Sequence, residues 1–166
     1  MTDPDRPLAI VDIDGVLADV RHRLRHLERQ PKDWRRFFAE AARDEPHPEG
    51  LAVVQRLRPD HDIVLLTGRP RHLERATRTW LARHGLDDLR LVMRPPGDSR
   101  PAAQVKVEQL AELGAGRTVA VVVDDDPLVI EAMAEAGYPT FLADWEPRAD
   151  REERALRSAQ EEEGRT

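Results

Sequence analysis

Short apolar runs alternate with amphipathic stretches along the chain, and this alternation limits the folds that the sequence can adopt. The strong runs, rich in β-branched residues, cover 8–11, 63–66, 89–93 and 119–123, and a weaker fifth covers 139–142. Continuous apolar runs of this length are typical of strands buried on both faces. Because the stretches between them are long enough for helices, we expect an α/β fold in three layers, a parallel sheet with helices on both faces.

Proline and glycine mark the ends of the helices that we expect between the strands. The helical patterns cover 49–57, 70–84, 102–113 and 127–136. Pro70 and Pro127 can each lie in the first turn of a helix, where the missing N–H costs nothing. Gly85 and Gly137 follow the last helical residues, so we expect these two helices to end there.

One segment is too long for an ordinary connection between a strand and a helix. Residues 18–48 contain a cluster of basic side chains and a helical pattern over 33–43. Long insertions in compact domains are commonly functional, so we expect 18–48 to form a small helical cap over the site. We expect the aromatic side chains of Trp34, Phe37 and Phe38 to pack this cap onto the body of the domain rather than to stack on a ligand.

Length and composition indicate one domain. The chain has 166 residues and no cysteine, which excludes disulfides and thiolate metal sites. We expect 1–146 to form the domain and 147–166 to be a charged tail or helix. The first residues are polar and acidic, and no apolar run approaches the roughly 20 residues of a membrane span. We therefore expect a cytoplasmic protein without a membrane contact.

The charge of the chain is negative overall but unevenly distributed. A formal net charge of -6 argues against a broad nucleic-acid surface, because phosphate backbones require basic protein surfaces. Three segments, 21–29, 69–78 and 90–106, are nevertheless net basic. We expect them around the edge of the site, so a polyanionic substrate would be held by a local basic rim.

Polar residues follow each strong strand of the predicted sheet. They are Asp12 and Asp14 after the first, Thr67, Gly68 and Arg69 after the second, Arg94 after the third, and Asp124, Asp125 and Asp126 after the fourth. Ligand sites of open parallel sheets lie beyond the carboxyl ends of the strands, so we expect these side chains at one edge. Carboxylates from two strands repel one another unless a cation lies between them, and Mg²⁺ prefers such oxygen ligands. The expected ligands are Asp12, Asp14, Asp124 and Asp125.

The remaining aspartate of this edge and the histidines are assigned structural positions. Asp126 directly precedes Pro127, so we expect its side chain to cap a helix. The six histidines show no metal-ligand spacing with one another, and we expect them at surface or helix positions.

The Asp12-Ile13-Asp14 stretch has the groups that phosphoryl transfer requires. The period of a strand directs both carboxylates to one side. There one can attack phosphorus, while the other protonates the leaving oxygen and later activates water. Gly15 lets the chain turn sharply so that backbone approaches a phosphate. Thr67 offers a hydroxyl to the phosphoryl oxygens, and the Lys106 ammonium offsets charge on the nucleophile and the transferring group.

Four motifs, in this order, resemble those of the haloacid dehalogenase superfamily. They are Asp12-Ile13-Asp14-Gly15-Val16-Leu17, Leu66-Thr67-Gly68-Arg69, Lys106, and Val123-Asp124-Asp125. The resemblance extends through Trp145 and implies a Rossmann-like sheet, magnesium, Asp12 as nucleophile and Asp14 as general acid and base. It also implies a phosphatase, since dehalogenase members lack the second aspartate. Of the adjacent aspartates, it favours Asp125 as the direct metal ligand and Asp124 as a helper that acts through water or holds Lys106.

A narrower resemblance is to the phosphatase domain of phage-type polynucleotide kinase-phosphatases, which remove 3'-phosphates from nucleic-acid ends. It rests on Leu91-Val92-Met93-Arg94, Gly97-Asp98-Ser99-Arg100 and Val105-Lys106-Val107-Glu108. The substrate-binding residues that it implies are Gly15, Arg23, Gly68, Arg69, Asp98 and Arg100. The sequence has no GxxxxGK[ST] phosphate loop, so we expect no kinase half and regard a separate kinase or ligase as a candidate partner.

We therefore expect a magnesium-dependent phosphomonoesterase that acts through a phosphoaspartate on Asp12, on DNA or RNA 3'-ends. An alternative is a phosphatase for a small nucleotide or sugar phosphate. A receiver domain, which accepts a phosphoryl group for signalling, also gathers aspartates, a threonine and a lysine at strand ends. In a receiver, however, the lysine follows the last catalytic strand, whereas Lys106 precedes the second acidic pair here. The order of the motifs therefore favours the enzyme.

Overall fold

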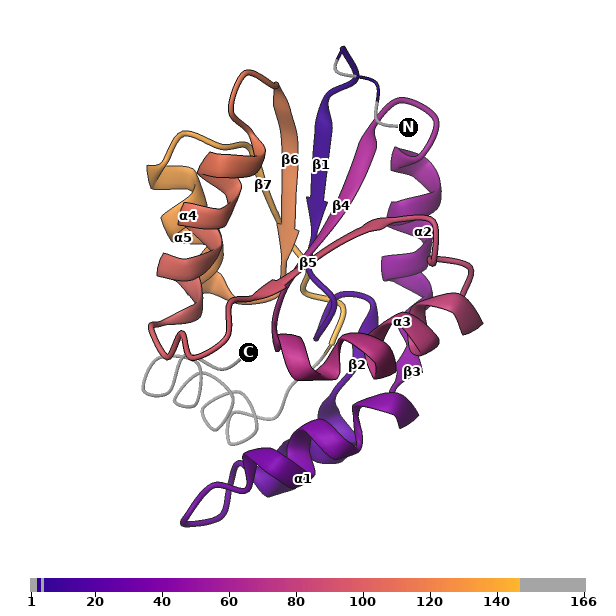
Figure 1. The fold of residues 1–166 in the computed structure, drawn as a ribbon. Helices are drawn as coiled ribbons and strands as arrows, with labels where there is room; N and C mark the ends of the chain where they lie inside the picture. Colours follow the sequence, from indigo (N-terminus) through magenta and orange to yellow (C-terminus); the bar gives the residue numbers. More distant parts are fainter. Residues whose placement is uncertain (1–2, 4, 147–166) are drawn as a thin grey trace.

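The computed structural model describes Asp3 and residues 5–146, and the expected tail over 147–166 lies outside them. A five-stranded parallel sheet in the order β5-β4-β1-β6-β7 forms the centre of the molecule (Figure 1). Helices cover both faces, which confirms the predicted three-layer α/β fold. Within the described part, no helix is long and apolar enough to cross a lipid bilayer.

The strands begin and end close to the expected positions. Their bounds are β1 Leu8–Val11, β4 Asp62–Pro70, β5 Arg90–Arg94, β6 Val119–Asp124 and β7 Thr140–Leu142. β4 is longer than expected, because it continues beyond Leu66 to Pro70. After an irregularity in the register, Pro70 pairs with Arg94 of β5. The residues between Leu66 and Pro70 are therefore held within a strand rather than in a free loop.

The helices on the two faces also follow the predicted pattern. Their bounds are α2 Pro48–Leu57, α3 Glu74–Arg83, α4 Ala102–Leu113 and α5 Pro127–Glu135. Asp126 caps α5 as expected, since its side chain accepts a hydrogen bond from the backbone N–H of Leu128. The prediction that Pro70 lies in the first turn of a helix is wrong. Its ψ of 149° is extended, and a 3-10 helix, η3 Arg71–Leu73, separates it from α3.

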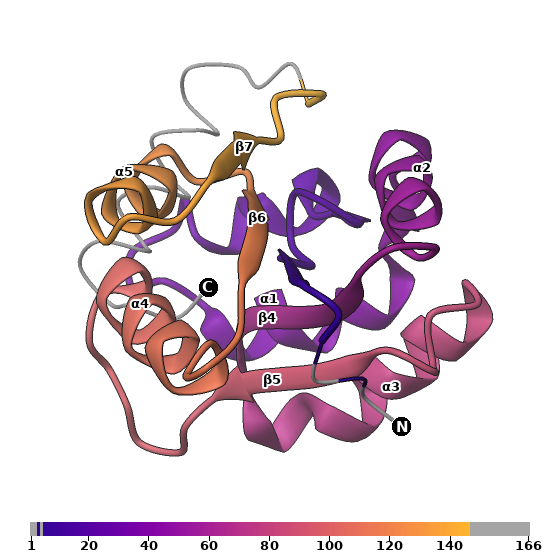
Figure 2. The same ribbon diagram turned by 90° about the horizontal axis from the view of Figure 1, so that it is seen from above.

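β1 is buried on both faces because its alternating side chains enter two different cores. Ala9 and Val11 pack in the core beneath α2 and α3, whereas Leu8 and Ile10 pack in the core beneath α4 and α5. Figure 2 shows the two helix pairs on opposite sides of the sheet. The carboxyl end of β1 is therefore fixed from both sides at the middle of the molecule.

Residues 18–48, the insertion, form a small unit beyond the carboxyl ends of the strands (Figure 1). Its elements are β2 Ala18–Asp19, the 3-10 helix η1 Arg21–His26, α1 Trp34–Ala39, the 3-10 helix η2 Ala41–Arg43 and β3 Glu45–Pro46. Trp34, Phe37 and Phe38 pack with Val20, Leu24 and Leu27 in a core of the insertion itself. Among the described residues, the body contributes Leu73 to that cluster. The three aromatics are therefore packing residues, as expected, and they pack within the insertion as well as against Leu73 of the body.

Candidate active site

The first motif leaves β1 in a tight turn. Gly15 has a φ of 79°, a conformation that side chains disfavour. The carbonyl of Ile13 accepts hydrogen bonds from the backbone N–H groups of Leu17 and Ala18, both at 2.9 Å. A Cβ atom at Gly50, near the start of α2, would collide with the carbonyl of Val16. The helix therefore packs directly on this turn and holds it in place.

Three carboxylates and one ammonium group form the innermost part of the site. Oxygen atoms of Asp12, Asp124 and Asp125 lie within 4.8 Å of one another. Lys106, from α4, places its Nζ 3.2 Å from Asp12 Oδ1 and 2.7 Å from Asp124 Oδ2. The other oxygen of Asp124 accepts a hydrogen bond from the backbone N–H of Asp126. Asp124 therefore holds Lys106 and the loop after β6.

The Asp14 carboxylate faces two arginines and lies outside this acidic group. Its Oδ1 accepts hydrogen bonds from Arg69 Nη2 at 2.6 Å and from Arg23 Nη2 at 2.8 Å. Its Oδ2 is buried and has no hydrogen-bond partner among the described residues. Asp12 and Asp14 contact different partners because β1 ends at Val11. The strand period that would direct both side chains to one side does not extend to them.

A further buried aspartate, Asp44, completes this set of charges. Its Oδ2 accepts hydrogen bonds from Arg23 Nη2 at 2.8 Å and Arg69 Nη2 at 3.0 Å, and its Oδ1 accepts one from Arg23 Nε at 2.9 Å. Its backbone carbonyl accepts a hydrogen bond from the indole of Trp80. Two arginines and two aspartates thus neutralise one another where an unpaired charge would be costly.

The sequence analysis did not find Asp44. Its two arginine partners lie 21 and 25 residues away along the chain. The local sequence marks only the end of a helical pattern. Arg23 and Arg69, which the resemblance places on the substrate phosphate, both contact Asp14 and Asp44 in this structure.

Burial and charge move the pKa values of the two motif aspartates in opposite directions. Burial raises the pKa of Asp12 well above its ordinary value; Lys106 opposes this, while the neighbouring carboxylates reinforce it. Burial also acts to raise the pKa of Asp14, but Arg69 and Arg23 outweigh it and lower that pKa to about 2. Burial alone would lower the pKa of Lys106, yet Asp12 and then Asp124 hold it above its ordinary value.

The acidic group fits a magnesium ion. Its donors are hard carboxylate oxygens that converge, as Mg²⁺ requires. Because the pKa of Asp12 is raised, Lys106 alone does not balance the negative charge of the group. Both oxygens of Asp124 are engaged, one by Lys106 and one by the backbone N–H of Asp126, so Asp12 and Asp125 are the carboxylates that would hold the ion. The Asp14 carboxylate, also predicted as a ligand, is not brought into this group.

The end of β4 carries the residues that the second motif predicts to bind the substrate phosphate. Thr67 is buried, and its hydroxyl oxygen accepts a hydrogen bond from the backbone N–H of Arg69 at 3.2 Å. The carbonyl of Gly68 accepts a hydrogen bond from Arg94 Nε at 3.3 Å. Arg94 therefore ties the end of β4 to the end of β5, where it is itself buried.

The loop over 95–100 is held by the same arginine. Arg94 Nη1 donates hydrogen bonds to the carbonyls of Asp98 and Arg100 at 3.2 and 2.9 Å. The Arg100 side chain, which the sequence predicts at the substrate, bonds to the carboxylates of Asp98 and Glu108 in this structure. Asp98 has its pKa lowered to about 2, chiefly by its hydrogen bond from Arg100.

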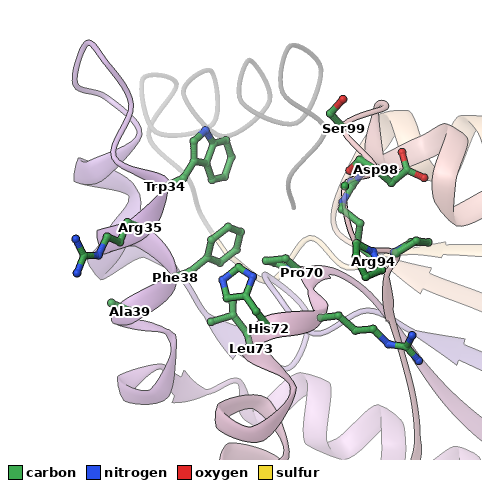
Figure 3. A pocket seen from close by; sticks show the side chains of 14 residues that line it. Trp34, Arg35, Phe38, Ala39, Pro70, His72, Leu73, Arg94, Asp98 and Ser99 are labelled. Atoms are coloured by element: carbon green, nitrogen blue, oxygen red, sulfur yellow. Dashed lines mark hydrogen bonds between the residues drawn. The ribbon is translucent and has the colours of Figure 1, made fainter.

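A cavity of about 810 Å³ lies between the insertion and this loop. Figure 3 shows Trp34 and Phe38 on the α1 side of the cavity and Arg94 and Asp98 across from them. Pro70, which directly follows Arg69, also lines it. The cavity therefore begins one residue from an arginine of the site.

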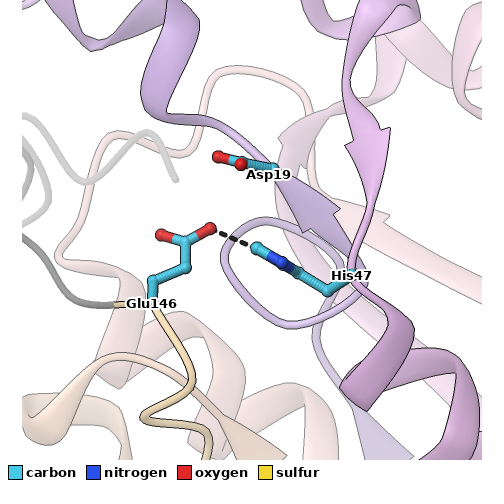
Figure 4. Close-up of side chains that lie close together, drawn as sticks. All are labelled: Asp19, His47 and Glu146. Atoms are coloured by element: carbon cyan, nitrogen blue, oxygen red, sulfur yellow. Dashed lines mark hydrogen bonds and ion pairs between the residues drawn. The ribbon is translucent and has the colours of Figure 1, made fainter.

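A second group of polar side chains lies away from these carboxylates. His47, expected at the surface or in a helix, is buried beside the Glu146 carboxylate, which its Nε2 contacts (Figure 4). Asp19 lies within 4.8 Å of this pair and is bound by Arg21. These contacts join β2, the start of α2 and the segment after β7.

Comparison with known proteins places this geometry in a family. The family described as "Polynucleotide kinase PNKP phosphatase domain" matches residues 7–144. Among curated protein sequences, none matches the chain.

Solved structures share the fold. A chain in the "Pnkp1/Rnl/Hen1 RNA repair complex" has a TM-score of 0.68 and 24% identity over 85% of this chain, which spans only 44% of that chain. The class C acid phosphatase from Bacillus anthracis has a TM-score of 0.63 and 12% identity, covering 93% of this chain and 79% of its own. A haloacid dehalogenase-like hydrolase from Streptococcus pneumoniae has a TM-score of 0.56 and 8% identity, covering 82% and 84%.

Proposed function

The chain belongs to the polynucleotide kinase PNKP phosphatase domain family and is a phosphatase of the haloacid dehalogenase superfamily, and we propose a specific activity for it. The proposed enzyme depends on magnesium and removes 3'-phosphates from nucleic-acid ends. The observation that carries the proposal is the division of charge around the first motif. Asp12 lies beside Lys106 and other carboxylates, whereas Asp14 lies beside two arginines. In the free protein the ionised form of Asp12 is disfavoured and Asp14 is ionised; bound magnesium and a bound substrate phosphate would reverse both states, which suits Asp12 as nucleophile and Asp14 as acid.

Asp12 is the nucleophile. One of its oxygens forms a bond to phosphorus while the bond from phosphorus to the leaving 3'-oxygen breaks, which gives a phosphoaspartate. Lys106, 3.2 Å from Asp12 Oδ1, offsets negative charge on the nucleophile and the transferring group. Magnesium bound by Asp12 and Asp125 would supply further positive charge, keep Asp12 ionised and polarise the phosphoryl oxygens.

Asp14 is the general acid and then the general base. It gives a proton to the leaving 3'-oxygen, then takes one from the water that attacks phosphorus and releases inorganic phosphate from Asp12. Arg69 and Arg23 keep Asp14 ionised in the free protein. A substrate phosphate that binds these arginines competes with Asp14 Oδ1 for them, so Asp14 can then take up a proton from solvent and hold it. The loss of two favourable contacts raises its pKa.

The enzyme would act on ends made available by other repair enzymes. The family and the fold shared with a chain of the RNA repair complex support an end-healing role. We propose that a separate kinase or ligase acts on the same ends, as DNA or RNA. No kinase phosphate loop occurs in this sequence.

A substrate panel tests the proposal. Phosphate release is measured with and without Mg²⁺ from a 3'-phosphorylated oligonucleotide, a 5'-phosphorylated oligonucleotide, mononucleotides, sugar phosphates and an aryl phosphate. The 3'-phosphorylated oligonucleotide should have the highest kcat/KM, and a chelator should abolish turnover. If mononucleotides or sugar phosphates are preferred by a large factor, the enzyme is a small-molecule phosphatase instead.

A further inference from the structure

We propose that Asp19, His47 and Glu146 form a second metal site, which binds a zinc ion apart from the acidic group around Asp12. One donor atom from each of the three side chains lies within 4.8 Å of the other two. Figure 4 shows the three side chains together, from β2, the residue before α2 and the segment after β7. The phosphatase reaction uses none of them.

The donor atoms of this group favour zinc over magnesium. They are one imidazole nitrogen and two carboxylate oxygens, which are ordinary zinc ligands, whereas Mg²⁺ prefers oxygen alone. Ligands of one zinc ion lie about 2.0–2.2 Å from it, so two of them are at most roughly 4.4 Å apart. A small movement of the side chains therefore brings all three donors onto one ion, which takes the place of the direct contact between His47 and Glu146.

Burial and charge also favour a cation at this position. The side chains of His47 and Glu146 are 8% and 3% exposed. Two carboxylates that lie close together away from water repel one another unless positive charge lies between them. Arg21 binds Asp19, but its own side chain is 41% exposed and therefore well solvated. An ion held by the neutral imidazole adds two positive charges at the centre of the group.

The site joins three segments around the turn of the first motif. Asp19 belongs to β2 and His47 directly follows β3, the paired strands at the two ends of the insertion. The backbone N–H of His47 donates to the Leu17 carbonyl at 2.8 Å, and the Trp145 indole donates to the Val16 carbonyl at 3.2 Å. A zinc ion therefore ties the base of the insertion to the segment after β7 and holds this turn between them.

Zinc binding is measured by calorimetry on the full chain. The titration with Zn²⁺ is made in excess Mg²⁺ and is repeated with Asp125→Asn, which lacks a carboxylate of the acidic group. In both experiments one zinc ion should bind per chain. At a free zinc concentration 100-fold above the Kd, Tm should rise by roughly 5–11 °C.

Three variants locate the ion. His47→Gln removes the imidazole but keeps an amide donor beside Glu146, and Asp19→Asn leaves the contact between His47 and Glu146 intact. Each should weaken zinc binding by about tenfold or more and cancel the rise in Tm. His72→Gln is the matched control, because His72 is exposed and lies outside the group; its zinc affinity should stay within about twofold of the original.

The metal-free Tm separates a lost ligand from a folding defect. Asp19→Asn breaks a solvated ion pair with Arg21, so its metal-free Tm should stay within about 4 °C of the original.

Three results would overturn the site. They are no zinc binding in excess Mg²⁺, zinc binding that disappears in Asp125→Asn, and a zinc affinity that is unchanged in His47→Gln or in Asp19→Asn. In each case His47 and Glu146 form a structural contact alone, and the reaction proposed for Asp12 is unaffected.

Discussion

Asp44→Asn removes a single charge from the buried set that joins the insertion to the site. Asp44 accepts three hydrogen bonds from Arg23 and Arg69, and both arginines are 1% exposed or less. An asparagine has the same shape, but its amide nitrogen donates and therefore opposes the guanidinium group that it would face. One positive charge is left without its partner in the interior.

The magnitude follows from this loss. Breaking a buried ion pair by removing one partner costs about 3–5 kcal/mol. For a chain of 166 residues, 1 kcal/mol lowers Tm by roughly 2–4 °C. We therefore expect Asp44→Asn to lower Tm by roughly 6–20 °C, a large part of the stability of a typical domain. Where the variant is folded, KM for the phosphorylated substrate should rise, because Asp44 also orients the two arginines.

Chemical denaturation of four variants measures this effect: Asp44→Asn, Asp60→Asn, Arg23→Gln, and the double variant of Asp44 and Arg23. Asp60→Asn makes the same substitution at an exposed position and should change the free energy of unfolding by less than about 0.5 kcal/mol. In the double variant Asp44→Asn, Arg23→Gln, the remaining Asp14 and Arg69 balance one another. Its loss should be smaller than the sum of the single losses by at least about 1 kcal/mol. A loss below about 1 kcal/mol for Asp44→Asn, or strict additivity in the double variant, would refute the reasoning.

Three further predictions concern the acidic group. Asp125→Asn should weaken Mg²⁺ binding, measured by calorimetry, by about tenfold or more. Asp124→Asn should chiefly lower kcat, because Lys106 loses its 2.7 Å contact with the carboxylate. If Asp124→Asn weakens Mg²⁺ binding and Asp125→Asn chiefly lowers kcat, the two roles are exchanged. Because the pKa of Asp12 is raised, protons compete with the metal, so Mg²⁺ affinity should increase as pH rises from about 5 to 8, and a flat profile would contradict this. At pH values above the ordinary pKa of an aspartate, the raised pKa of Asp12 makes its ionisation destabilise the metal-free fold. Asp12→Asn should therefore raise the Tm of the metal-free protein at neutral pH, while phosphate release stops. A lower Tm would contradict this.

Features that depend on local pattern could be predicted from the sequence. The continuous apolar runs identify the buried strands because residues at both parities of β1 enter cores. Once the strands are known, parallel topology brings Asp12 and Asp124 to the same edge without further information. The helix cap at Asp126 follows from one side chain and the proline after it.

Features that depend on contacts between distant segments could not be predicted from the sequence. Asp44 has no local signal, because its role arises only when the insertion folds back over Arg69. For Arg100, motif position assigns the side chain to the substrate, and its ion pairs with Asp98 and Glu108 become visible only in the structure. The aromatic residues of α1 were assigned to packing, yet Trp34 and Phe38 both pack and line the cavity.

The most direct test of the central claim is mass spectrometry of the enzyme after an acid quench during turnover of a 3'-phosphorylated single-stranded oligonucleotide with Mg²⁺. The account predicts one phosphoryl group on the peptide that contains Asp12, and none with the 5'-phosphorylated oligonucleotide or with Asp12→Asn. Phosphate release from the 3'-end at an undiminished rate by Asp12→Asn, or a phosphoryl group on another residue, would contradict it.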